Sequence, residues 1–277
     1  MSPRVVGYQT FFRNARRSRR LLLVAVILGL SVSPVLGAVL TDAAAKAFSE
    51  YVDRARRSFL DRVNQPLGVG VTERAALQRE ETTVRPGGGD GIQTMPASLI
   101  HHWRGTVFIP RTTLSQALSV SRAYPNYPTI FRPVVAAKVL SEDGDAVRVQ
   151  FRMKQSAGGI TGVIDMWSNI RYGNVDPKHA YVISIADTIR EVKDAGRPTE
   201  HFVSPDHESG YLWRAATFTR FVEDDGGVYM EMETIGLSRP FPPLLGWAIE
   251  PIARRIGRGS VENSVQEFRR AVLKRDS

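Results

Sequence analysis

Hydrophobic and polar residues alternate strictly between residues 145 and 154. Alternation with a period of two sends successive side chains to opposite faces of an extended chain, so this stretch predicts a half-buried antiparallel strand. One face carries Val147, Val149, Phe151 and Met153, and the other carries Arg148, Gln150, Arg152 and Lys154. Residues 133–140 precede it across Glu142-Asp143-Gly144, which predicts a β-hairpin.

A second hairpin is predicted nearer the C-terminus. Residues 211–221 and 228–237 flank a turn at Asp225-Gly226, and in that register Arg220 lies opposite Glu231 and Phe221 opposite Met230. One face then holds Thr217, Thr219, Phe221, Met230 and Met232. Further strands are expected at 101–109, 160–172 and 179–191, with a polar connection over 194–210.

Apolar residues at spacings of three and four predict helices over 41–64 and from Ser260 to the C-terminal region. The first stripe is Phe48, Val52, Ala55, Phe59 and Val63, and the second is Val261, Val265, Phe268 and Val272. We expect the first helix to pack on the domain rather than on a membrane surface. A short helix is expected over 113–123, and an apolar helical segment over 244–256, interrupted at Pro251 and ended by Gly257 and Gly259. The glycine-rich stretch 85–91 predicts a flexible loop.

The N-terminus has the pattern of a secretory signal. Residues 1–37 hold six arginines and no acidic residue, and an apolar run begins at Leu21. Pro34 and small residues follow, so we expect cleavage between Gly37 and Ala38. The alternative is an uncleaved membrane anchor over 21–40, which is just long enough to span a bilayer. Either way the body of the protein is expected to be exported, periplasmic or secreted, and possible membrane association would run through 21–40.

Composition narrows the function classes. The chain of 277 residues has no cysteine, which excludes disulfides, thiolate metal sites and cysteine nucleophiles. Its net charge of +9 owes six units to the arginines of 1–37, so the remainder has an excess of only three positive charges. A charge excess this small, spread over both signs, does not predict nucleic-acid binding.

Few residues have the pattern of a catalytic or metal site. The predicted strands carry Asp165, Asp187 and Glu233 as acid/base candidates, and Asp165 shares a face with Trp167. Asp165 is the one candidate catalytic residue, although it could instead pair with Arg171 or Arg190. His201, Asp206, His207 and Glu208 cluster in the polar connection, but we expect no metal and no cofactor. The sequence has no His-Glu-x-x-His motif and no Gly-x-Ser-x-Gly motif.

Three segments resemble the START-like and birch-pollen-allergen superfamily, which includes polyketide cyclase-like proteins. They are residues 102–110 (HWRGTVFIP), 225–233 (DGGVYMEME) and 245–252 (LGWAIEPI). The resemblance implies an α+β helix-grip fold, in which a curved antiparallel sheet wraps around a long C-terminal helix, here with an extra N-terminal helix. The expected division is 1–37 as signal peptide or anchor, 38–96 as helix and linker, and 97–277 as the START-like domain.

The resemblance also implies an apolar cavity between the sheet and the last helix. We expect an exported domain that binds or carries an apolar small molecule such as a lipid, rather than an enzyme. The alternatives are a polyketide cyclase or hydrolase-type enzyme that uses Asp165, and a noncatalytic envelope module with a filled core. The expected ligand-binding residues are Trp103, Val149, Phe151, Met153, Trp167, Tyr181, Trp213, Thr217, Thr219, Phe221, Met230, Met232 and Phe268.

Overall fold

The computed structural model describes residues 38–157, 160–242 and 245–275. The predicted signal peptide or anchor at 1–37 lies outside these residues. Within the described part, no helix is both long enough and apolar enough to cross a membrane. The helices are α2 (Asp42–Leu60), α3 (Val71–Gln78), α4 (Leu114–Arg122), α5 (Tyr127–Ile130) and α6 (Gly246–Arg275), with a 3₁₀ turn, η1, at Tyr124–Asn126.

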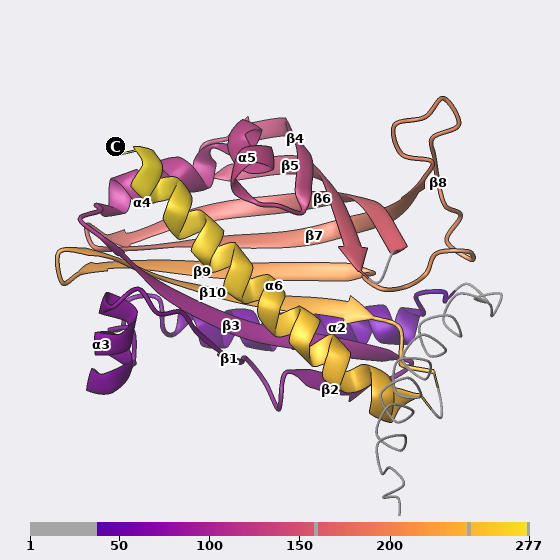
Figure 1. Cartoon of the computed structure of the whole chain (residues 1–277), viewed down its shortest axis with the longest axis horizontal. Helices are drawn as coiled ribbons and strands as arrows, with labels where there is room; N and C mark the ends of the chain where they lie inside the picture. Colours follow the sequence, from indigo (N-terminus) through magenta and orange to yellow (C-terminus); the bar gives the residue numbers. More distant parts are fainter. Residues whose placement is uncertain (1–37, 158–159, 243–244, 276–277) are drawn as a thin grey trace, which may run out of the picture.

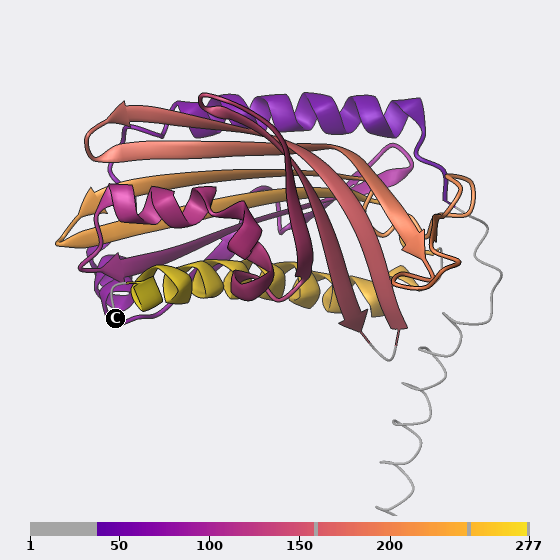
Figure 2. The ribbon, with the colours of Figure 1, turned by 90° about the horizontal axis from the view of Figure 1, so that it is seen from above.

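The strands form one antiparallel sheet. They are β1 (Thr83–Pro86), β2 (Ile92–Met95), β3 (Ser98–Pro110), β4 (Val134–Asp143), β5 (Ala146–Ala157), β6 (Ile160–Asp176), β7 (His179–Lys193), β8 (His201–Phe202), β9 (Arg214–Asp224) and β10 (Gly227–Ser238). The order is β1-β3-β10-β9-β7-β6-β5-β4, with β2 paired to β3 and β8 to β7. The sheet is strongly curved, α6 lies on its concave side, and α2 lies on the opposite side (Figures 1 and 2).

We call the face that packs on α6 the inner face and the face that packs on α2 the outer face. Inner-face residues such as Val149 and Met230 form one cluster with Val265 and Phe268 of α6. Outer-face residues such as Phe218 and Ile235 form a second cluster with α2. The predicted helix-grip α+β fold with an extra N-terminal helix is thereby confirmed.

The two predicted hairpins are confirmed, and so is the register of the second. Arg220 pairs with Glu231 and Phe221 with Met230 across β9 and β10. The helix stripe at 41–64 is also confirmed, because Phe48, Val52, Phe59 and Val63 are buried against the outer face. Thr41 caps α2 through its hydroxyl, which accepts a hydrogen bond from the Ala44 amide.

One prediction about local structure is wrong, a second is only partly right, and one helix was not predicted. Helix α6 runs without a break through Pro251, Gly257 and Gly259, so no separate helix begins at Ser260. The stretch 85–91 contains the end of β1 and, from residue 87, the loop that joins β1 to β2, and two of the loop's glycines pack closely on β3. A Cβ at Gly87 would lie 2.2 Å from the His102 ring, and one at Gly91 would lie 2.3 Å from the Trp103 ring. Residues 71–78 were not predicted to form a helix, and they form α3.

Candidate functional site

The inner face has a section that is completely closed. Val149, Phe151, Phe221 and Met230 are buried there beneath the C-terminal half of α6. The rings of Phe221 and Phe268 lie 5.7 Å apart, centroid to centroid. This section is a packed core and leaves its side chains out of reach of solvent.

A second section of the inner face is incompletely covered, and we call it the open section. It consists of Met153, Met166, Ser184, Thr217, Met232 and Thr234, all of which are only partly buried. They come from five neighbouring strands, β5, β6, β7, β9 and β10, and the register sets Thr217 between Ser184 and Thr234. Thr234 pairs in turn with Trp103, whose indole lies against Gly257 of α6. The open section is therefore continuous with the contact between the sheet and the N-terminal half of α6.

The open section combines apolar and hydroxyl side chains. Met153, Met166 and Met232 supply three flexible thioethers. Ser184, Thr217 and Thr234 place three hydroxyls side by side across β7, β9 and β10. Within the described residues, none of these three hydroxyls has a hydrogen-bond partner on another side chain. The arrangement can therefore contact an apolar body and a polar group of one molecule.

Ten of the predicted ligand-binding residues lie on the inner face or on the side of α6 that faces it. They are Trp103, Val149, Phe151, Met153, Thr217, Thr219, Phe221, Met230, Met232 and Phe268. Only Met153, Thr217 and Met232 of this set belong to the open section. Sequence reasoning missed Met166, Ser184 and Thr234, which could have been found from the same alternation once the register was fixed.

The other three predicted ligand-binding residues lie on the outer face, so they do not line the space between the sheet and α6. Trp167 packs on Phe202, with ring centroids 6.0 Å apart. Tyr181 packs on Phe59 of α2, with centroids 6.2 Å apart. Trp213 is buried in the cluster beneath α2. The aromatic type alone did not indicate the face, since both faces of this sheet are covered by a helix.

The candidate catalytic carboxylate is also placed on the outer face, and this corrects the catalytic hypothesis. Asp165 is buried and accepts hydrogen bonds from Nε and Nη2 of Arg152 at 2.7 and 2.9 Å. Gln150 donates a third at 3.3 Å. The partner is Arg152 on the neighbouring strand, not the expected Arg171 or Arg190. A carboxylate held this way, with the sheet between it and the open section, does not act on a ligand there.

The remaining acid/base candidates are also held by hydrogen bonds and ion pairs. Burial acts to raise the pKa of Asp187, but hydrogen bonds from Arg148 and Asn169 outweigh it and lower that pKa. Glu233 lies in an outer-face network with Arg62, Arg104 and His102. Its carboxylate oxygens lie 2.8 Å from Nη2 of Arg62, 3.1 Å from Nη2 of Arg104 and 2.8 Å from Nε2 of His102. Burial likewise acts to raise the pKa of Glu233, and the His102 hydrogen bond and the Arg104 charge outweigh it.

Apart from the pairing of Arg220 with Glu231, the outer-face network was not predicted. Glu231 is 1% exposed and pairs with Arg220 and Arg62 at 3.2 and 2.8 Å, while Arg220 donates to the backbone oxygens of Arg62 and Leu67. These bonds attach the end of α2 and the segment after it to the sheet.

The described residues hold no group of three His, Asp or Glu side chains that could bind a metal ion. His207, one of the residues that cluster in the sequence, forms a hydrogen bond with Ser204.

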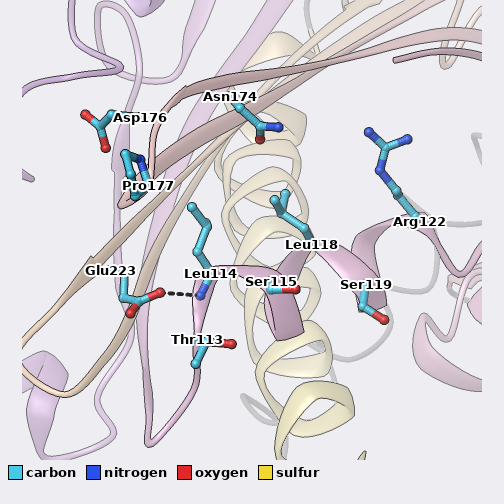
Figure 3. Close-up of a pocket in the computed structure, with 10 residues that line it drawn as sticks. All are labelled: Thr113, Leu114, Ser115, Leu118, Ser119, Arg122, Asn174, Asp176, Pro177 and Glu223. Atoms are coloured by element: carbon cyan, nitrogen blue, oxygen red, sulfur yellow. Dashed lines mark hydrogen bonds between the residues drawn. The ribbon is translucent and has the colours of Figure 1, made fainter. Parts of the chain in front are cut away.

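A separate hollow of about 730 Å³ lies between α4 and the turn from β6 to β7 (Figure 3). It is open to solvent and mixed in character, with Leu114 and Leu118 beside Ser115, Arg122, Asn174 and Glu223. Glu223 accepts a hydrogen bond from the Leu114 amide at the start of α4. Arg122 is held by Asp145 at 2.6 Å and lies over the Tyr172 ring. Glu223 and Arg122, the two charged residues named here that line the hollow, thus both make contacts within the protein.

Known proteins are similar to this chain in structure and not in sequence. No protein-family model matches the chain, and no curated protein matches it in sequence. Solved structures do match. A STAR-related lipid transfer protein from Xanthomonas axonopodis is 14% identical, with a TM-score of 0.45, over 69% of this chain and 98% of that one.

Two others are a START superfamily protein from Mycobacterium smegmatis and the Zhui aromatase/cyclase from Streptomyces sp. R1128. The first is 10% identical with a TM-score of 0.42 over 63% of this chain and 98% of that one. The second is 13% identical with a TM-score of 0.40 over 64% of this chain and 96% of that one. The chain is thus similar to START-like and aromatase/cyclase structures, and its own sheet order and α6 define the helix-grip fold.

Proposed function

We propose that the protein binds or carries an apolar small molecule, such as a lipid, in the open section of the inner face. The observation that supports this is the contrast between the two sections of one face. The closed section buries Phe151, Phe221 and Met230, whereas Met153, Met166 and Met232 stay partly exposed on the same sheet. Exposed apolar side chains in a concave position gain free energy when a ligand covers them.

The residue types suit a ligand of variable shape. Methionine side chains are unbranched and adapt to irregular surfaces, and their thioethers make favourable contacts with rings. Burying about 300 Å² of apolar surface contributes about 7 kcal/mol before the costs of association are subtracted. The hydroxyls of Ser184, Thr217 and Thr234 are placed to contact a hydroxyl or carbonyl group on the same ligand. An amphipathic molecule with a small polar group fits this combination best.

A matched pair of substitutions on β7 tests the proposal. Ser184→Phe places a ring in the open section, while Thr188→Phe places the same ring on the exposed outer side of the strand, opposite Trp167. The measurement is equilibrium binding of Nile red, an apolar fluorescent probe, to the full chain and both variants. We expect saturable binding that Ser184→Phe weakens at least about tenfold and Thr188→Phe leaves unchanged.

Two results would contradict the proposal. One is an absence of saturable probe binding to the unsubstituted protein, which would favour the noncatalytic module with a filled core. The other is equal loss of binding in both variants, which would mean that the effect is general rather than local. Circular dichroism and thermal unfolding show whether each variant is folded. We further propose that the protein works as an exported, periplasmic or secreted molecule, which fractionation of cells that produce the full chain would test.

A further inference from the structure

The N-terminal half of α6 presents large apolar side chains to solvent. Trp247 is 80% exposed, Ile252 is 51% exposed and Ile256 is 53% exposed, and Leu245 just before the helix is 38% exposed. Ile252 and Ile256 are one helical turn apart, so they lie on one side of α6. That side is not the one that packs on the sheet, which carries Val261, Val265 and Phe268. Soluble proteins rarely gather such residues on a surface without a use for them.

Two arginines lie among these apolar residues. Arg255 and Arg258 are exposed, and no acidic side chain in the described residues pairs with either. The neighbouring Arg254 is different, because it is held by Asp90 and Glu250. We call Leu245, Trp247, Ile252, Arg255, Ile256 and Arg258 the docking surface. Ile252, Arg255 and Ile256 share one side of α6, whereas Trp247 and Arg258 are exposed around the same half of the helix. Tryptophan and arginine beside exposed aliphatic residues are typical of the boundary between lipid headgroups and acyl chains.

The docking surface lies at the end of the molecule where the described chain begins. The Ala38 amide donates to the backbone oxygen of Glu208, and the Arg239 amide donates to that of Gly210, seven residues before α6. Exposed Val39 and Tyr211 add to the apolar character of this end. Figures 1 and 2 show the start of α2 and the start of α6 at the same end. The preceding residues 1–37 contain an apolar run after six arginines.

We propose that the docking surface binds a lipid bilayer that contains anionic headgroups. A bilayer takes up the apolar side chains in its interface, while Arg255 and Arg258 meet the negative headgroups. A second copy of the chain fits less well, because a two-fold interface would bring the four arginines of two copies together without acidic partners. The proposal does not depend on a ligand in the open section.

The absence of cysteine makes a direct test possible. Ile256→Cys and Val71→Cys each give the full chain a single site for the fluorophore NBD. Val71 is the matched control, since it is 88% exposed at the start of α3, at the other end of the molecule (Figure 1). Both proteins are reconstituted in phosphatidylcholine vesicles with and without phosphatidylglycerol, and quenching by brominated phosphatidylcholine is measured.

We expect the label at residue 256 to shift to the blue and to be quenched in vesicles with phosphatidylglycerol, and the label at residue 71 to do neither. Substituting both Arg255→Gln and Arg258→Gln should lower the ratio of docked to undocked protein roughly 30-fold. Ser184→Phe should leave docking unchanged, so a failure of ligand binding and a failure of docking are distinguished. Equal quenching at the two positions, or none at residue 256, would overturn the proposal. So would a blue shift without vesicles that grows with protein concentration, which would indicate a second copy.

Discussion

Gly257 of α6 lies directly against Trp103 of β3, so closely that a Cβ at residue 257 would stand 2.7 Å from the indole Nε1. The complementary contact is made one turn later, where a Cβ at Gly105 of β3 would stand 2.6 Å from Cγ1 of Val261. A glycine on each element thus lets helix and sheet approach closely. This approach fixes the course of α6 along the edge of the open section.

The first prediction compares two glycines of α6. Gly257→Ala should destabilise the protein by about 1–3 kcal/mol, because the rigid indole must move to admit the methyl group. Gly259→Ala should stabilise it by up to about 1 kcal/mol, because nothing lies within 4 Å of that Cβ and alanine favours the helix. Chemical denaturation of both variants measures the difference. Equal effects of the two substitutions would mean that the contact with Trp103 does not constrain α6.

This contact also explains what the sequence could and could not predict. Strict alternation on β5 and the turn at Asp225-Gly226 fix strands and register locally, so those predictions succeed. Gly257 and Gly259 disfavour a helix by local propensity, whereas the packing of α6 on Trp103 and Gly105 of β3 favours it. Local pattern therefore predicted a break where tertiary contact maintains one helix.

The sequence also failed to predict on which face of the sheet some strand residues lie. Trp167 and Tyr181 are aromatic and half-buried, but they lie on the outer face, which α2 and the 194–210 segment cover. A β-bulge between Trp167 and Ser168 also shifts the alternation against β7. With helices on both sides of a sheet, hydrophobicity does not distinguish a ligand-facing residue from one that packs on the second helix.

A second prediction concerns the stability of the protein at low pH. The pKa of Glu233 is lowered in the folded protein, so its contribution to stability is complete above its unfolded pKa of about 4.3 and is lost as the pH falls through the folded value. Glu233→Gln should cost about 3 kcal/mol at neutral pH, because Arg62 and Arg104 lose a buried partner. Urea denaturation from pH 7 to about pH 3 should show the two proteins converging at the acid end. A difference that is independent of pH would contradict this.

A third prediction concerns the stability of the protein at high pH. Tyr124 and Tyr172 hydrogen-bond to each other at 2.7 Å between their hydroxyl oxygens, inside the core beneath α4. Burial and the neighbouring Tyr172 raise the pKa of Tyr124 well above its usual value. The protein should therefore lose stability as the pH rises past about 10, where tyrosine ionises in the unfolded chain. Denaturation at about pH 11 should show a smaller alkaline loss for Tyr124→Phe than for the unsubstituted protein.

A fourth prediction separates Asp165 from ligand binding. Asp165→Asn keeps the shape of the side chain but leaves Arg152 with a neutral partner on the outer face. We expect a loss of stability of about 1–3 kcal/mol and unchanged affinity for Nile red. Weaker probe binding in a fully folded Asp165→Asn protein would return this carboxylate to the functional site.

The methionines offer the most direct test of ligand binding in the open section. Of the six methionines in the chain, Met153, Met166 and Met232 line that section, Met230 is 0% exposed in the closed section, and Met95 packs with the outer-face cluster. The measurement is the ¹³C-methyl spectrum of methionine-labelled protein during titration with an apolar, lipid-like ligand. We expect saturable shifts in the methyl signals of Met153, Met166 and Met232, with those of Met95 and Met230 nearly unmoved. Unchanged signals from the first three methyl groups, or equal shifts in all five, would contradict binding in the open section.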